Sequence, residues 1–147
     1  VYGVLSQNRK MDMVFDWDKF LSFEGNSAPY IQYTHARACS VLRKADASEK
    51  ITFPLNIDFL EENERNLIKT LLKFSNSLSD SCNAHMPHLL TNYLFSLCQD
   101  YNTFYNDLPI VKADEPLRSL RISLTALTAS VIKTGANILT LRIPNRM

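Results

Sequence analysis

Hydrophobic residues recur at every third or fourth position along residues 88–105, and this spacing constrains the fold more than any other feature of the chain. The stripe consists of Leu90, Leu94, Leu97, Tyr101 and Phe104. In an α-helix such positions share one face, which is the pattern of a helix that buries one side. The same step recurs at Leu117, Leu120, Leu124, Leu127 and Val131. Because no segment shows the two-residue alternation of a half-buried strand, the sequence predicts an all-α protein.

The first long helix is expected between residues 26 and 44. Asn26 or Ser27 can cap its start, since both side chains accept hydrogen bonds from backbone N–H groups. Pro29 is tolerated in a first turn, where its missing N–H costs nothing. No helix breaker follows before Asp46, so this helix should end near Lys44.

Further helices should follow along the rest of the chain. Asp58 can cap the second helix while Glu61 reaches back to complete a capping box. Pro116 suits the first turn of a later helix. The proline and the acidic residues within 106–115 predict a loop before that helix. The expected ranges are Asp58–Phe74, 88–105, Pro116–Gly135 and one short helix before Pro144.

One compact domain preceded by a connector is the expected organisation. The chain has 147 residues, 46% of them hydrophobic, and one domain commonly takes roughly 100 to 200 residues. Residues 1–23 hold short apolar pieces broken by acids, which favours an irregular connector with one helical turn. Residues 24–147 should form a bundle of four to five helices. Because Val1 is not an initiator methionine, we expect the chain to be part of a longer protein.

Charge and cysteine content exclude several classes of protein. The net charge is only +1, so no overall field favours nucleic acid or membranes, and any basic surface must be local. Candidates for such a surface are Arg37, Arg43, Lys44, Arg142 and Arg146. Three cysteines in helical surroundings argue against a secreted disulfide scaffold. Without a signal peptide or a transmembrane stretch, a cytoplasmic protein is expected.

The segment 30–44 carries tyrosines and basic residues at helical spacing. Tyr30, Tyr33, Arg37 and Lys44 form one stripe of the expected helix. Aromatic rings stack on unpaired bases and arginines neutralise phosphates, so this stripe suits RNA loops. The alternative is that both tyrosines belong to the core and the basic side chains merely extend to water. The residue pattern alone leaves both interpretations open.

Three separated blocks of the chain resemble one known family. They are FDWDKFLSFEGNSAPYIQYTHARACSVLRK at residues 15–44, YLFSLCQDYNTFYND at 93–107 and LRIPNRM at the end. These blocks are similar to the anticodon-binding domain of arginyl-tRNA synthetases and occur in the same order. The resemblance implies a helical C-terminal domain of a class I synthetase that grips the anticodon loop of arginine tRNA. It assigns contacts with that loop to Tyr30, Tyr33, Arg37, Arg43, Tyr105 and Met147.

The resemblance also implies roles for the whole enzyme. Such a synthetase ligates arginine to its tRNA using ATP with Mg²⁺, through a HIGH-type tetrapeptide and a KMSKS-type loop. Neither motif occurs in this sequence, so we expect no catalytic residue, no cofactor and no aminoacylation by this chain alone. The implied partner is the anticodon stem-loop of arginine tRNA, bound by a monomer, with no DNA and no membrane as partner.

The chain departs from this family at two places near the expected contacts. Thr140 stands where relatives have a glycine in the turn before the end, and a non-glycine residue resists a left-handed turn. The path of the tail to Met147 is therefore open. After Tyr105, an aromatic residue of some relatives is replaced by the turn at Asp107 and Pro109.

Two other functions compete with RNA binding. Cys82, His85 and His88 stand three residues apart, but a structural zinc site needs four ligands in closed geometry and Pro87 interrupts their alignment, so no metal site is expected. A helical module that docks a protein partner through an apolar stripe is the second alternative. Such a module would not need tyrosines and arginines clustered on a wet surface.

Overall fold

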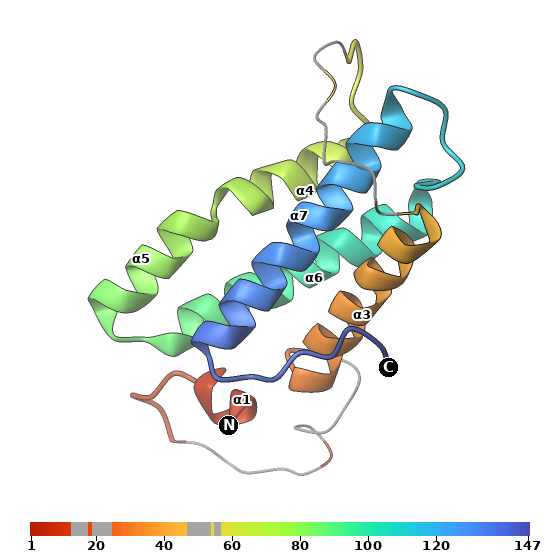
Figure 1. Cartoon of the computed structure of the whole chain (residues 1–147). Helices are drawn as coiled ribbons and strands as arrows, with labels where there is room; N and C mark the ends of the chain where they lie inside the picture. The colour runs from red at the N-terminus through yellow and green to blue at the C-terminus, as the bar shows by residue number, and fades with distance from the viewer. Residues whose placement is uncertain (13–17, 19–24, 47–53, 55–56) are drawn as a thin grey trace.

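The computed structural model describes residues 1–12, 18, 25–46, 54 and 57–147. Within these ranges the chain is helical and has no β-strand (Figure 1), so the predicted all-α fold class is confirmed. The helices are α1 (Tyr2–Leu5), α3 (Ala28–Lys44), α4 (Glu62–Leu72), α5 (Phe74–Ala84), α6 (Pro87–Asp107) and α7 (Leu117–Ile138). Residues 13–17 and 19–24 of the expected connector lie outside the described residues, and its boundary at residue 23 stays a prediction.

Helix α6 forms the centre of the bundle. It contacts α1, α3, α4, α5 and α7, and Figure 1 shows α7 crossing in front of it between α3 and α5. The predicted stripe of α6 is buried, because none of its five side chains, Leu90 through Phe104, is more than 1% exposed. Full burial of a large apolar side chain contributes about 1.5 to 3 kcal/mol. This stripe is therefore the core on which the other helices pack.

Helix α3 begins and ends close to the predicted positions. The Ser27 hydroxyl oxygen accepts a hydrogen bond from the Tyr30 N–H at 3.3 Å, which caps the helix. The helix ends at Lys44, and Asp46 then takes a left-handed conformation with φ 54°. One face buries Ile31 and Ala38 against α6 and α7. The opposite face remains accessible to water.

The second predicted helix starts later than the sequence pattern indicates. Helix α4 begins at Glu62 with Glu61 as its cap, not at Asp58. The capping box is real but is displaced, because the carboxylate of Glu64 accepts the N–H of Glu61 at 2.8 Å. Both Asp58 and Glu61 have an acidic residue three positions later, so the sequence allows either start. Burial of Glu64 within the bundle favours the later one.

Two further predictions about the helices are wrong. The expected second helix ends at Phe74 and no helix is predicted for residues 75–84, but Phe74–Ala84 forms α5, which continues almost directly from α4 after Lys73. The short helix expected before Pro144 is absent. Helix α7 runs on to Ile138, and residues 139–147 form a non-helical tail.

Thr140 occupies the left-handed turn that ends α7. Its φ is 58°, a conformation that L-residues with branched side chains adopt at a cost. The Leu141 N–H donates to the Ala136 carbonyl at 2.8 Å and the Thr140 N–H donates to the Asn137 carbonyl at 3.0 Å. These two bonds are those of a Schellman motif, in which glycine usually holds the left-handed position. The glycine is missing, but the turn that it favours is formed.

Replacing Thr140 with glycine should therefore stabilise the fold. Relief of the left-handed strain outweighs the greater freedom of glycine in the unfolded chain, for a gain of about 0.5 to 1 kcal/mol in the free energy of unfolding. Urea denaturation followed by circular dichroism measures this gain. Thr134→Gly is the matched control, because Thr134 is an exposed threonine in helical conformation on α7, the helix that the turn at Thr140 ends. That control should lose a few tenths of a kcal/mol, and an equal loss at Thr140 would contradict the prediction.

Candidate functional site

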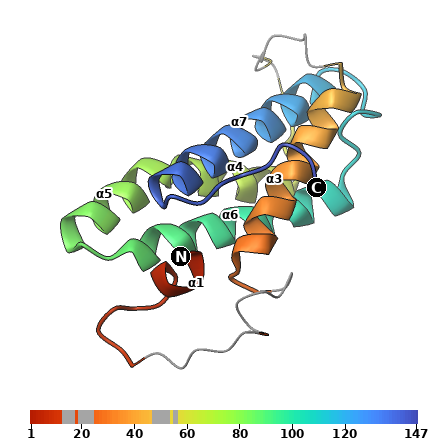
Figure 2. The ribbon, with the colours of Figure 1, turned by 60° about the horizontal axis from the view of Figure 1, so that its bottom comes forward.

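The C-terminal tail, residues 139–147, lies along α3. Figures 1 and 2 both show the end of the chain crossing this helix. Gln32 Nε2 of α3 donates to the backbone carbonyl of Arg142 at 2.7 Å. Arg43 Nη1 donates to the carbonyl of Asn145 at 3.0 Å. Side chains of α3 thus fix the path of the tail and bring the last residues of the chain beside the tyrosine and arginine stripe.

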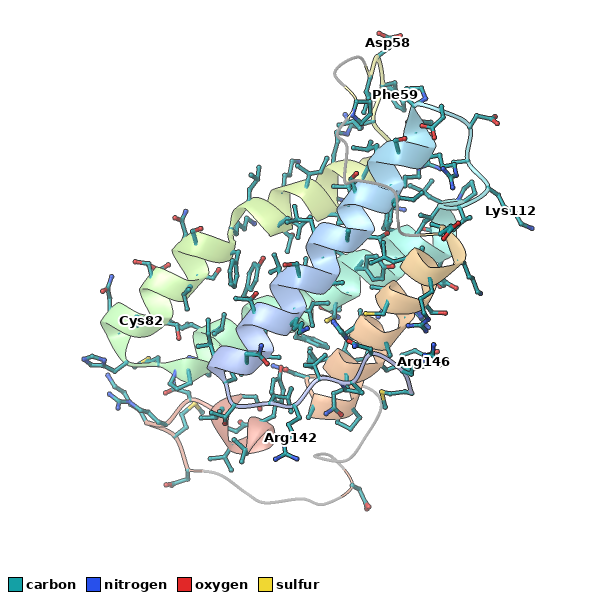
Figure 3. The ribbon with its side chains drawn as sticks, viewed as in Figure 1. Asp58, Phe59, Cys82, Lys112, Arg142 and Arg146 are labelled. Carbon is teal, nitrogen blue, oxygen red and sulfur yellow. The ribbon has the colours of Figure 1, made fainter. Side chains whose placement is uncertain are left out.

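A hollow of about 330 Å³ opens where α3, the end of α6 and the tail meet. We call it the α3 hollow. Its lining residues are Tyr33, Ala36, Arg37, Ser40, Val41, Arg43, Lys44, Tyr105, Arg146 and Met147. Four of these side chains are cationic and none is acidic. Figure 3 shows one of them, Arg146, on the tail beside α3. Because the net charge of the chain is only +1, a basic surface has to be local. These four cationic side chains form such a surface.

Arg37 lines the α3 hollow and contacts two of its aromatic rings. Its guanidinium carbon lies 4.7 Å from the centroid of the Tyr33 ring and 4.9 Å from that of the Tyr105 ring. Nη2 donates to the Tyr33 hydroxyl at 3.1 Å, and Nη1 donates to the side-chain oxygen of Asn102 at 2.7 Å. Tyr33 is 46% exposed and Tyr105 is 36% exposed. Two aromatic rings are thus held by one cation while both remain open to water.

The structure brings five of the six predicted site residues to this hollow and places the sixth beside it. Tyr33, Arg37, Arg43, Tyr105 and Met147 line the hollow. Tyr30 is half-buried: its ring packs on Phe95 at 5.4 Å between centroids, and its hydroxyl accepts a hydrogen bond from Asn102. For Tyr30 the core interpretation therefore holds in part. Tyr33 faces water.

Sequence reasoning missed several residues of this region. Lys44 was placed in the stripe that suits RNA but not among the contacts implied by the family resemblance, and Arg146 was counted only as a basic residue. Ala36 and Ser40 are small side chains on α3 that leave the hollow open between larger neighbours. Asn102 bonds Arg37 from α6, and no sequence signal distinguishes it from the other polar residues of that helix.

His35 fastens the tail to the buried side of α3. Its side chain is 2% exposed, and Nδ1 lies 3.0 Å from the Pro144 carbonyl oxygen. Because a carbonyl only accepts, Nδ1 must carry the proton in this bond. The sulfur atom of Cys39 lies 3.7 Å from the Nε2 atom of His35. Burial lowers the pKa of His35, and the positive charge of Lys133 acts in the same direction, against the raising effect of the Pro144 bond.

Acidification should consequently destabilise the fold through His35. With a folded pKa below the usual 6.5, the unfolded chain binds the proton more readily. The contribution of His35 is then fully present above the unfolded pKa and is lost as the pH falls from about 6.5 through the folded pKa. Urea denaturation at about pH 7.5 and pH 5.5 should show a smaller free energy of unfolding at the lower pH. His35→Gln should reduce this difference, and an undiminished difference in the variant would contradict the prediction.

Cys82 lies in the last turn of α5 and His85 directly follows that helix. His85 ends α5 in a left-handed conformation with φ 53°. Cys82 is exposed at the far end of the molecule from Arg146 (Figure 3). Among the described residues, no group of three or more histidine, cysteine or acidic side chains is arranged to hold a metal ion. None of the helices described here has the length and hydrophobicity that crossing a membrane requires.

The fold and the α3 hollow together define a class of protein, an all-α bundle that presents exposed tyrosines and cations on one face. Comparison with known proteins narrows this class to a family. Residues 31–147 match the family described as the DALR anticodon binding domain. The chain belongs to this family.

Two relatives of this chain carry the same name, arginine-tRNA ligase. The arginine-tRNA ligase of Photobacterium profundum is 39% identical over an alignment of 147 positions, which covers 99% of this chain and 25% of that protein. The arginine-tRNA ligase of Hamiltonella defensa is 42% identical over an alignment of 148 positions, which covers 99% of this chain and 25% of that protein. The chain therefore spans about a quarter of the length of the curated relatives it matches.

Solved structures show the same fold. The arginyl-tRNA synthetase of Thermus thermophilus matches with a TM-score of 0.77 and 35% identity over 86% of this chain and 22% of that chain. A putative arginyl-tRNA synthetase from Campylobacter jejuni matches with a TM-score of 0.83 and 27% identity over 99% of this chain and 32% of that chain. The resemblance inferred from the three sequence blocks is thus confirmed.

Proposed function

We propose that this chain binds the anticodon stem-loop of arginine tRNA through the α3 hollow. The observation that carries the proposal is the position of Arg37, which holds the rings of Tyr33 and Tyr105 at a water-facing surface lined by cations. Unpaired bases stack on such rings, and positive side chains offset the charge of the phosphates between them. The membership of the chain in an anticodon-binding family supports the same ligand.

Each lining residue has a role that its chemistry suits. Tyr33 and Tyr105 offer flat faces to splayed bases, and Arg37 supports both rings. Arg43 lies at the edge of the hollow beside the tail, where it can reach phosphate or base edges. Met147, which is 64% exposed, adds an apolar wall. Tyr30 contributes its hydroxyl group from the next turn of α3.

The longer protein that we propose this chain to be part of ligates arginine to its tRNA using ATP with Mg²⁺. This proposal rests on the relatives, of which the chain covers about a quarter. The chain itself lacks the two ATP-binding motifs of such enzymes, so arginine-dependent turnover of ATP should be absent from the purified chain. We propose that it acts as a cytoplasmic monomer and that RNA, rather than DNA, is its ligand.

Binding of a synthetic RNA stem-loop tests this function. The chain should bind a hairpin that carries an arginine anticodon, and its affinity should fall as salt rises from about 50 to 200 mM, because bound cations release counterions from phosphates. A hairpin with altered anticodon bases should bind about tenfold more weakly, since unmatched base edges leave hydrogen-bonding groups unpaired. A DNA hairpin of the same sequence tests the preference for RNA. Equal, salt-independent affinity for all three would refute the proposal.

A further inference from the structure

Asn102 connects the two helices that form the α3 hollow, although it does not line it. Its Oδ1 accepts from Arg37 Nη1 at 2.7 Å. Its Nδ2 donates to the Tyr30 hydroxyl at 3.0 Å and to the Thr34 hydroxyl at 3.1 Å. One amide from α6 therefore contacts three side chains of α3, and two of these belong to the predicted site.

The chemistry of these groups fixes the direction of every bond in the network. A guanidinium only donates, so the oxygen of the Asn102 amide must face Arg37 and its nitrogen must face the two hydroxyls. The Thr34 hydroxyl donates its hydrogen to the backbone carbonyl of Tyr30 at 2.9 Å. Both hydroxyls therefore accept from Asn102. In the described part of the structure, the hydrogen bonds leave the Tyr30 hydroxyl hydrogen without an acceptor.

We infer that Asn102 is a positioning residue for RNA binding, a role that rests on the proposed function. It holds the Arg37 guanidinium over Tyr33 and Tyr105 before RNA arrives. It also donates to the oxygen of the Tyr30 hydroxyl, which leaves the hydrogen of that group to donate toward the ligand. The chemical partner that fits such a donor is a base carbonyl, a ring nitrogen or a phosphate oxygen.

This arrangement reduces the ordering that binding requires. An arginine side chain loses several rotamers when it is immobilised at an interface, and that loss opposes binding. Asn102 removes the loss in advance, because Arg37 is already fixed at both terminal nitrogens. Without the amide, the hydrogen bond that Arg37 retains among the described residues is the one to Tyr33 on the same helix, beside its contact with the Tyr105 ring. Its guanidinium then moves with that exposed side chain.

The test compares Asn102→Ala with Asn106→Ala in the whole chain of 147 residues. Asn106 is an exposed asparagine one turn further along α6. The probe is the RNA stem-loop with an arginine anticodon. Asn102→Ala should weaken its binding about three- to tenfold, which corresponds to ordering one long side chain upon binding. Asn106→Ala should leave the affinity within about twofold.

A spectroscopic measurement separates positioning from general stability. In nitrogen-15 NMR spectra of the free chain, the Arg37 side-chain N–H signals should be sharp and protected in the unaltered protein and should be averaged in Asn102→Ala. Asn102→Asp retains the acceptor for Arg37, so it should restore these signals, whereas it loses the donor to Tyr30. Signals of Arg37 that are identical in all three proteins would overturn the inference.

The outcomes for the inference and for the proposed function are distinguishable. Failure of the unaltered chain to bind the stem-loop would refute the proposed function, and with it any role of Asn102 in RNA binding. Binding by the unaltered chain together with equal binding by Asn102→Ala would overturn the positioning role alone. A weakened affinity accompanied by averaged Arg37 signals supports both.

Discussion

Replacing Glu64 with alanine should lower the free energy of unfolding by about 3 to 5 kcal/mol, because it leaves a buried arginine without its counter-charge. Arg121 Nε donates to Glu64 Oε1 at 2.7 Å, and the two side chains are 5% and 0% exposed. Arg121 Nη1 also donates to the Pro109 carbonyl at 2.8 Å. The pair therefore ties α4 to α7 and to the loop that precedes α7. Urea denaturation of the variant measures the loss.

Glu62→Ala provides the matched control for this prediction. Glu62 is an exposed glutamate in the same first turn of α4. Its removal should cost no more than about 0.5 kcal/mol, the usual range for surface substitutions. Glu64→Gln is a second probe, because it keeps the shape and one acceptor oxygen while removing the charge. If Glu64→Ala proved as mild as Glu62→Ala, the ion pair would contribute little to the fold.

The long helices could be predicted from the sequence because their apolar stripes persist over several turns. Leu90, Leu94 and Leu97 leave only one helix face for the core, and that face is buried as expected. The start of α3 was also predictable, since Ser27 is a strong cap placed just before Pro29. Local chemistry and burial agree in these segments, so the pattern alone is sufficient.

The wrong predictions about secondary structure lie in segments whose conformation depends on tertiary contacts. Helix α5 has few apolar residues, and Phe74 and Leu78 pack on a core that the other helices supply. Its helical conformation depends on α6, with which it is in contact, and not on a stripe of its own. The tail takes an extended path because Arg43, Gln32 and His35 bind its carbonyls. No pattern within the tail records these distant partners.

The candidate site likewise contains residues that the sequence pattern predicts and residues that it does not. Helical spacing places Tyr33 and Arg37 on one face of α3, and the structure adds Tyr105 to the same hollow. Spacing could not bring Tyr105 or Met147 beside them, because these residues come from distant segments. Their assignment came from the family resemblance. Asn102 could not be found by either route, since an asparagine on the polar face of a helix carries no signal until its partners are known.

Arg37→Ala should weaken binding of the arginine anticodon stem-loop by about 10- to 100-fold, the largest loss expected for a single residue of the α3 hollow. The change removes one positive charge and also the cation that holds both rings; stacking of a base on an aromatic ring is worth about 1 to 3 kcal/mol. Because the support is lost for every base, affinity should fall alike for cognate and altered anticodons.

Two further substitutions separate charge from geometry. Arg37→Lys keeps the charge but loses the planar fork that bonds Asn102 and Tyr33 together, so it should recover only part of the affinity. Arg65→Ala is the matched control, since Arg65 is an exposed arginine over the Phe59 ring at 5.8 Å and lies outside the hollow. The affinity of Arg65→Ala for the stem-loop should stay within about twofold of that of the unaltered chain. Equal losses in Arg37→Ala and Arg65→Ala would mean that only net charge attracts the RNA, and that the α3 hollow does not read it.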